Sequence, residues 1–290
     1  MKAYNEKDIK VSEIMQLVIL HSLYALKESG DVFFQGGTAI RWCYSGMRFS
    51  EDLDFVTHLE KEQLSDLLNK ISGPVRKGMI AHFGNGEFEV STKKTSRPSS
   101  HIAFFRYRPI NERKNFSVKI EFERLKKNRA PQTQNMILYT LPLVSSLITA
   151  GEFRIPNAGS ILLVETKEEI LSDKIRALLE REYLKGRDFY DIWYLSKLNG
   201  VRCAPDMVLR KMSMYTAPFT PRRSVDDFLR PGKKERQEMI AAIRQDLSRF
   251  LPPEEFVIFE TGGFSDFFDA LKVVFTGFKS VDLVPPEEKT

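Results

Sequence analysis

The sequence predicts an α+β protein in which a mixed β-sheet domain, residues 1–160, precedes a helical domain, residues 161–290. Short apolar or alternating runs bounded by turn residues, which are typical of strands, fall almost entirely before residue 160. Beyond that point apolar residues recur at helical spacing. A glycine-rich turn between an apolar strand and a helix also lies in the first part, and such turns often bind phosphate groups.

Composition places the chain among ordinary soluble proteins. Its 290 residues are 42% hydrophobic and 29% charged, which allows one or two domains with a sizeable core. The formal net charge of +5 suits a polyanionic partner without requiring one. Two cysteines, Cys43 and Cys203, exclude a disulfide framework, and the four histidines show no metal-ligand spacing. The longest apolar stretch, residues 14–26, is too short and polar to span a membrane, so we expect a cytoplasmic protein.

The first predicted elements surround the glycine-rich turn. Residues 11–26 have the apolar pattern of a buried helix, and residues 32–34 that of a short buried strand. The turn Gly36-Gly37-Thr38 then opens a helix over residues 39–44. Because glycine tolerates unusual backbone angles and a helix N-terminus presents unpaired N–H groups, this turn is a candidate phosphate cradle.

The next strand, residues 52–56, carries the most informative pattern. Alternation places Asp52 and Asp54 on one face, while Leu53 and Phe55 enter the core. Two adjacent carboxylates suit a hard cation such as Mg²⁺. An exposed edge strand would show the same letters, but the glycine turn upstream favours a site. A phosphate cradle beside metal carboxylates is the equipment of phosphoryl or nucleotidyl transfer.

Further strands and one helix complete the predicted sheet domain. Residues 60–71 form an amphipathic pattern, which we expect Gly73 and Pro74 to end. Residues 88–90 and 102–107 predict an antiparallel pair.

Residues 117–123 show the cleanest alternation in the chain. Val118, Ile120 and Phe122 alternate with Lys119, Glu121 and Glu123. A third carboxylate for a metal site could come from Glu121 or Glu123, and we prefer Glu121 because it is central in the strand. A solvated sheet face that binds nothing is the alternative interpretation.

The helical part begins after a last short strand at residues 161–164. Thr166 and Glu169 make a capping box, so a helix should run from there to about residue 183. Lys174 lies close to the packed face of this helix, and a lysine there needs a partner. It could neutralise triphosphate charge, or it could extend along apolar surface into solvent.

Asp188 and Asp191 share a face of the next helix, where aspartate is also favoured simply by the helix dipole. The predicted helices are residues 189–198, 206–214, 225–229, 235–250 and 264–274. A basic cluster of Arg222, Arg223, Lys233, Lys234 and Arg236 is either a solvated face or a set of RNA phosphate contacts.

Three of these motifs together resemble a known family. Residues 36–41 followed by 48–55 look like the first motif of the AbiEii-type (DUF1814) nucleotidyltransferases, toxins of type IV toxin–antitoxin systems that are related to the MenT toxins. Residues 171–181 are similar to the third motif, a lysine helix that ends in arginine. Residues 187–193 are similar to the fourth, R-D-x-x-D. The resemblance spans residues 33–195, and its match at residues 119–121 is looser.

The resemblance implies a nucleotidyltransferase fold with a helical second domain, and transfer of NMP from an NTP with release of pyrophosphate. By position, the triphosphate would be held by Gly36, Gly37, Thr38, Arg48 and Ser50. Asp52 and Asp54 would bind Mg²⁺, with Glu121 as the third ligand that we prefer. Lys174 would contact phosphates, and Asp188 or Asp191 would position the acceptor or act as base.

The leading hypothesis is therefore a Mg²⁺-dependent nucleotidyltransferase toxin that uses an NTP to modify RNA, such as tRNA, with a cognate antitoxin as a further partner. One rival is an enzyme that modifies a small molecule of the antibiotic type or a protein. The other is a non-catalytic module that binds nucleotide or RNA. The sequence indicates neither the NTP nor the acceptor, and it assigns no role to residues 200–290.

Overall fold

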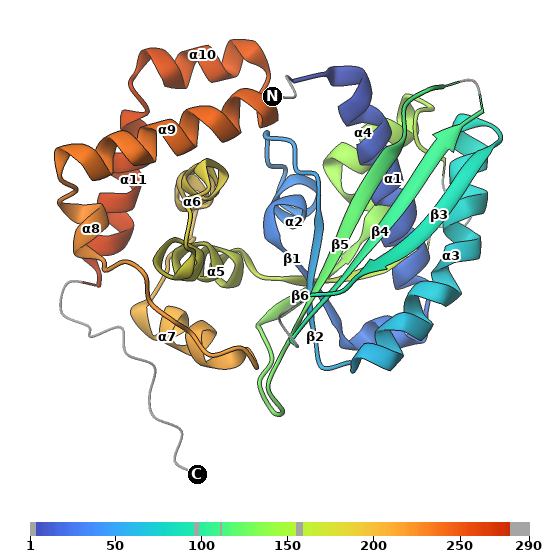
Figure 1. Cartoon of the computed structure of the whole chain (residues 1–290), viewed down its shortest axis with the longest axis horizontal. Helices are drawn as coiled ribbons and strands as arrows, with labels where there is room; N and C mark the ends of the chain where they lie inside the picture. Colours follow the sequence, from blue (N-terminus) through green and yellow to red (C-terminus); the bar gives the residue numbers. More distant parts are fainter. Residues whose placement is uncertain (1–3, 96–98, 111, 155–158, 279–290) are drawn as a thin grey trace. The chain divides into compact units, whose positions relative to one another are not determined.

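The computed structural model describes residues 4–95, 99–110, 112–154 and 159–278. The chain forms two compact units, one of residues 5–165 and the other mainly of the residues from 166 onward. Figure 1 shows both units and labels most of their helices and strands. The strand at residues 161–165 belongs to the first unit. That the units are independently folding domains stays a prediction.

The first unit is built on a seven-stranded mixed sheet with the order β3-β4-β5-β2-β1-β7-β6. Its strands are β1 Val32–Gln35, β2 Leu53–Thr57, β3 Gly86–Lys93, β4 Ser100–Pro109, β5 Phe116–Arg124, β6 Thr133–Ile137 and β7 Ile161–Glu165. The pairs β2–β5 and β1–β7 are parallel, and the others are antiparallel. The sequence predicts all of these strands except β6, whose side chains are exposed or half-buried and therefore show no apolar pattern.

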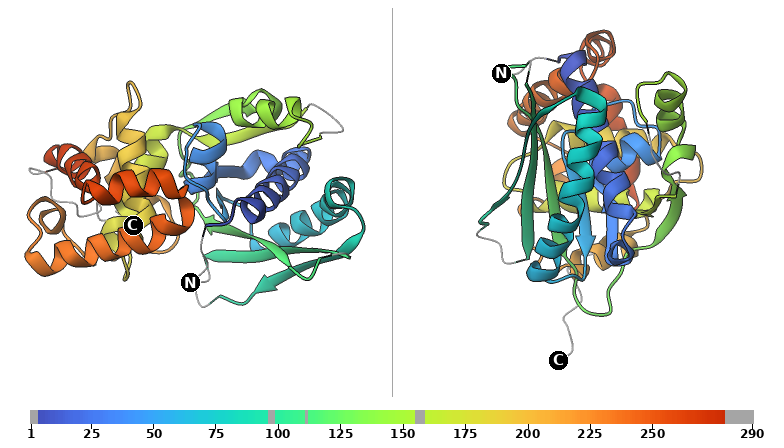
Figure 2. Two further views of the ribbon diagram at one scale, coloured as in Figure 1. Left: turned by 90° about the horizontal axis from the view of Figure 1, so that it is seen from above. Right: turned by 90° about the vertical axis from the view of Figure 1, so that its right-hand side faces the viewer.

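Helices cover the sheet and supply much of the core. The first unit contains α1 Glu6–Tyr24, α2 Gly36–Cys43, α3 Lys61–Phe83 and α4 Pro142–Thr149, with short 3-10 turns at Lys27–Asp31 and Leu138–Thr140. Helices α1 and α3 lie against one face of the β3–β5 part of the sheet (Figure 2). Ala103, Phe105 and Tyr107 of β4 are fully buried on that face.

The prediction that Gly73 and Pro74 end the third helix is wrong, because α3 continues through both residues to Phe83. Proline removes one backbone N–H and costs a helix interior about 3 kcal/mol. Val75 and Met79 lie beyond it and are fully buried. Burial of two such side chains contributes about 3–6 kcal/mol, so tertiary packing outweighs the local preference to stop.

The second unit is helical. It contains α5 Lys167–Glu180, α6 Gly186–Lys197, α7 Pro205–Met214, α8 Asp226–Leu229, α9 Lys233–Phe250, α10 Pro253–Thr261 and α11 Ser265–Thr276. The sequence analysis missed α10 because this helix buries none of its residues and so has no apolar stripe. Tyr190, Trp193 and Phe267 belong to an aromatic core. Within the described ranges, no helix has the length and apolarity needed to cross a membrane.

The close approach of α1 and α3 gives a stability prediction. A Cβ atom at Gly78 would lie 2.6 Å from Val18 Cγ1. We expect Gly78→Ala to lower the free energy of unfolding of the first unit by about 1–3 kcal/mol through overpacking. Substitution of the exposed neighbour Lys77 by alanine should change this free energy little.

Urea unfolding measures the effect, with Trp42 as reporter in a Trp193→Phe background, because the chain has only these two tryptophans. Gly78→Ala should be less harmful when Val18→Ala has opened the space, since residues in contact are energetically coupled. Equal effects of Gly78→Ala in both backgrounds would contradict the predicted contact.

Candidate active site

The turn between β1 and α2 lies directly against the Asp-x-Asp strand. Gly36 has φ of 80°, a left-handed conformation that favours glycine. A Cβ atom there would lie 2.5 Å from Asp54 Oδ2, and one at Gly37 would overlap with the Arg48 guanidinium. The first N–H groups of α2 therefore lie beside the Asp54 carboxylate, and a larger residue at either position would force these side chains to shift.

The carboxylates predicted to share a face come together around one lysine. Leu53 and Phe55 are fully buried, as alternation predicts. The parallel register of β2 and β5 pairs Asp54 with Glu121. Lys119 Nζ lies 3.1 Å from Asp52 Oδ2 and 2.9 Å from Glu121 Oε2. Two neighbouring strands thus bring three acidic side chains to one ammonium group.

This ammonium stays charged. Burial by itself would lower the pKa of Lys119, but the carboxylates of Asp52, Glu121 and Asp54 outweigh that effect and raise the pKa well above its usual range. Lys119 is therefore a fixed cation at physiological pH and cannot serve as a general base.

The carboxylates near Lys119 could also serve as ligands of a metal ion. Among the described residues, no three His, Cys, Asp or Glu side chains are arranged to hold one. Asp52 and Asp54 nevertheless offer only hard oxygen donors, and Mg²⁺ is commonly held by one or two carboxylates together with substrate phosphates. The pair fits an ion that arrives with a nucleotide. Glu121 as a third ligand stays a prediction, because its carboxylate contacts Lys119 and, at 3.4 Å, the Ser100 hydroxyl.

Three residues that were predicted to hold the triphosphate are buried and contact groups of the protein around the site. Thr38 is fully buried, and its hydroxyl donates to the Asp52 carbonyl. Arg48 is only 2% exposed, and its Nη1 donates to the Phe49 carbonyl at 2.9 Å. Ser50 is also buried, with its Oγ beside Gly37. These positions hold the Asp52 segment against α2, which leaves the turn backbone best placed for phosphate.

One supporting residue was missed by the sequence analysis. Gln16 of α1 is fully buried; its Nε2 donates to the Ser50 carbonyl at 2.6 Å, and its Oε1 accepts from Trp42 Nε1 at 3.2 Å. It joins α1, α2 and the segment before Asp52. A glutamine within an apolar helical run was the available signal, because a buried amide needs partners.

The helical unit brings its own predicted residues together. Lys174 Nζ lies 3.1 Å from Asp188 Oδ1 and 2.8 Å from Asp191 Oδ2. Both carboxylates are at most 1% exposed, and Lys174 is 11% exposed. Burial would raise the pKa of Asp188, but Arg181, which also pairs with it, and Lys174 outweigh burial and hold this pKa well below its usual range.

The basic cluster of the helical unit has partly structural roles. Arg223 donates to the Leu178 carbonyl at 3.5 Å and to the Glu182 carbonyl at 2.9 Å, so it satisfies backbone groups at the end of α5. The Arg236 guanidinium lies 4.1 Å from the Phe268 ring centroid. These two arginines are therefore engaged within the protein.

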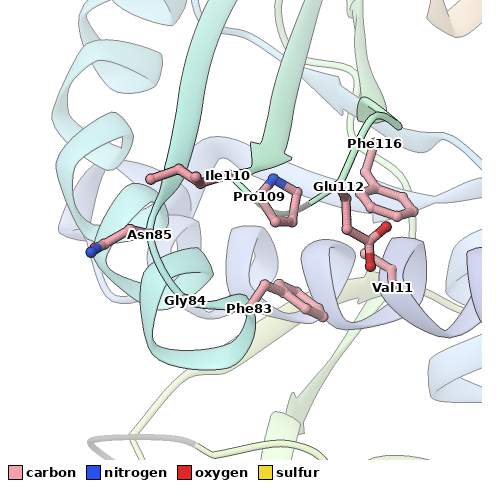
Figure 3. Close-up of a pocket in the computed structure, with 8 residues that line it drawn as sticks. All are labelled: Val11, Phe83, Gly84, Asn85, Pro109, Ile110, Glu112 and Phe116. Atoms are coloured by element: carbon pink, nitrogen blue, oxygen red, sulfur yellow. The ribbon is translucent and has the colours of Figure 1, made fainter.

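A cavity of about 380 Å³ lies elsewhere in the first unit (Figure 3). Phe83, Pro109 and Phe116, from the end of α3, the end of β4 and the start of β5, are among its described lining residues. That lining includes none of the predicted site residues, so the cavity is separate from the carboxylate cluster.

Comparisons with known proteins identify the family of the chain and its fold. The chain matches the family of AbiEii nucleotidyl transferase toxins of type IV toxin–antitoxin systems over residues 19–273. A search of curated proteins gave no match. A Helicobacter pylori protein proposed to be a nucleotidyltransferase has a similar structure, with 17% identity and a TM-score of 0.54 over 96% of this chain and 99% of that one. The structure of JHP933 from H. pylori is also similar, with 18% identity and a TM-score of 0.53 over 94% of each chain.

At this level of identity the two structures establish a shared fold. The family match covers the glycine turn, the Asp-x-Asp strand, Lys174 and Asp188. The predicted fold class is confirmed. The chain belongs to the AbiEii family of type IV toxin–antitoxin systems and is a nucleotidyltransferase.

Proposed function

We propose that this nucleotidyltransferase moves NMP from an NTP to a hydroxyl group of RNA, with Mg²⁺ as cofactor and tRNA as a fitting acceptor. The observation that carries the proposal is the Asp52 and Asp54 pair, which lies against the start of α2 and shares the Lys119 ammonium. An acceptor oxygen attacks the α-phosphorus, the bond to the bridging oxygen of the β-phosphate breaks, and pyrophosphate leaves. The hydroxyl proton is released in the same reaction.

The residues of the first unit divide this work. Backbone N–H groups of the Gly36-Gly37 turn bind the β- and γ-phosphates. Asp52 and Asp54 hold the divalent ion, which when bound neutralises charge on the phosphates. Lys119 orients the Asp52 and Glu121 carboxylates and limits their repulsion. Glu121, with 36% of its side chain exposed against 24% for Asp52, is the more accessible carboxylate and in this proposal accepts the proton of the attacking hydroxyl.

The geometry of the helical unit favours Asp188 and Asp191 as positioning residues for Lys174. A general base needs access to the acceptor and a pKa near the working pH. Asp188 is 1% exposed, pairs with two cations and has a strongly lowered pKa. Lys174 remains partly accessible, so it is the group that contacts substrate phosphates.

RNA is the acceptor class that the net charge of +5 and the toxin family favour. Family membership also implies an antitoxin partner. A small-molecule or protein acceptor, and a module that binds nucleotide without turnover, are outcomes that the following experiment distinguishes.

Incubation of the protein with total bacterial RNA, Mg²⁺ and each α-³²P-labelled NTP in turn should label RNA with one or more of the nucleotides. Asp52→Asn should reduce the labelling rate by about a hundredfold or more, because it weakens the site that would hold the divalent ion, whose charge would stabilise the reacting phosphate. Asp66→Asn, which changes an exposed carboxylate of α3, is the matched control and should retain the rate.

Full activity of Asp52→Asn would contradict the assigned site. Label that appears on protein or in a small-molecule fraction, but not on RNA, would show that the acceptor is a protein or a small molecule instead of RNA. NTP binding with no transfer to any fraction would favour the non-catalytic module.

The buried Asp188 also gives a pH prediction. Because its pKa is lowered in the folded state, its contribution to stability is complete above the unfolded-state pKa of about 4 and is lost as pH falls through the lower folded value. Asp188→Asn should therefore lower the free energy of unfolding of the helical unit by about 3 kcal/mol at pH 7. The difference from wild type should shrink below about pH 4.

Fluorescence of Trp193 on α6, in a Trp42→Phe background, measures this unfolding across the acid range. Glu254→Gln, at an exposed carboxylate of α10, should follow the wild-type profile. A constant difference between wild type and Asp188→Asn from pH 7 to strongly acidic pH would show that Asp188 is not held ionised by its neighbours.

A further inference from the structure

An aromatic side chain lies next to the carboxylate cluster on the same face of the sheet. In the β4–β5 register, Phe104 is opposite Lys119 and Ile102 is opposite Glu121. Directly paired residues of antiparallel strands point to the same face. The buried residues of β4 alternate with these two and face α1 and α3 instead. Phe104 and Ile102 are half-buried, so apolar surface continues outward from the cluster.

Arg106 extends this surface. Its guanidinium carbon lies 5.0 Å from the centroid of the Phe104 ring. Its Nη1 donates to Ser91 Oγ at 2.6 Å and lies 3.2 Å from Glu89 Oε1, both on β3. The guanidinium is therefore held in place beside the ring, although the Arg106 side chain stays 30% exposed. We call Ile102, Phe104 and Arg106 the β4 platform.

The chemistry of transfer specifies which part of the substrates lies over this platform. Attacking and leaving oxygens are roughly in line at the transferred phosphorus. In the proposed reaction, the pyrophosphate leaves toward the α2 turn beside β1, and the carboxylates of β2 and β5 surround the phosphorus. The sheet order β1-β2-β5-β4 then places the attacking hydroxyl on the β5–β4 side.

We propose that the β4 platform binds the base of the RNA nucleotide that carries the attacking hydroxyl, a role that rests on the proposed function. Aromatic rings and arginine planes stack on bases of any sequence. The exposed Lys93 of β3 is opposite Ile102 in the register and supplies a cation for the adjoining RNA phosphate. The platform therefore recognises an unpaired nucleotide with little preference for its base.

The test compares two short single-stranded RNAs, one intact and one that lacks the base of its 3′-terminal nucleotide. Phe104→Ala should raise the KM for the intact RNA about tenfold, since loss of base stacking on an aromatic side chain costs roughly five- to a hundredfold in affinity. Its kcat and its KM for NTP should stay near wild type. Loss of the terminal base should raise the KM of the wild-type protein for RNA by a similar factor. It should hardly change the KM of Phe104→Ala.

Phe88→Ala is the matched control, because Phe88 is half-buried on β3 but pairs with Tyr107 and so faces the helices. It should respond to the missing base as wild type does. Phe104→Leu keeps apolar bulk, removes the aromatic face and tests the same point if the alanine variant does not fold. An equal effect of the missing base in wild type and in Phe104→Leu would overturn the proposal, as would a rise in KM for NTP alone.

A binding measurement separates this proposal from the proposed function. Anisotropy of the fluorescently labelled intact RNA, measured without NTP, should show about tenfold weaker binding to Phe104→Leu than to wild type. Weaker binding by Phe104→Leu without nucleotide transfer would keep the platform as a binding site for an RNA base but reject RNA as the acceptor, and with it the proposed function. Equal affinity for both proteins would reject the platform, whether or not transfer occurs.

Discussion

The ion pairs of Lys119 are the interaction on which the candidate site depends. Parallel pairing of β2 and β5 brings Asp54 and Glu121 side by side, and Asp52 lies two residues before Asp54 along the chain. Three carboxylates so close together would repel one another in the absence of a cation. The Lys119 ammonium supplies that cation from within the sheet, and the same carboxylates keep it protonated. The cluster can therefore fold before any nucleotide or metal ion binds.

A second layer of side chains gives this cluster its rigidity. Gln16 bridges Trp42 and the Ser50 carbonyl, and Thr38 binds the Asp52 carbonyl. Each of these polar groups is buried and hydrogen-bonded, so displacement of one would leave another without a partner. Support of this kind keeps the Asp52 segment against the start of α2, where phosphate groups are expected to bind.

The charged groups of the helical unit are arranged in the opposite way. In the first unit, one lysine offsets part of the charge of three acidic side chains that remain partly accessible. In the helical unit, two fully buried aspartates hold one partly accessible lysine. The accessible groups are thus acids in the first unit and Lys174 in the second, and their contact with substrate stays a prediction. Sequence proximity alone does not distinguish these two arrangements.

The sequence by itself determined most strands, the helical second half and the face shared by Asp52 and Asp54, because these follow from local periodicity. It also identified Lys174 as a residue that needs a partner. Tertiary structure alone decided that α3 continues past Pro74, where burial outweighs a local signal, and that β6 forms at an edge without an apolar pattern. It also decided the partners of Lys119, the bridging role of Gln16 and the inaccessibility of Asp188. These features depend on residues far apart in the chain, whose pairing is set by strand register and helix packing and leaves no periodic signal in the sequence.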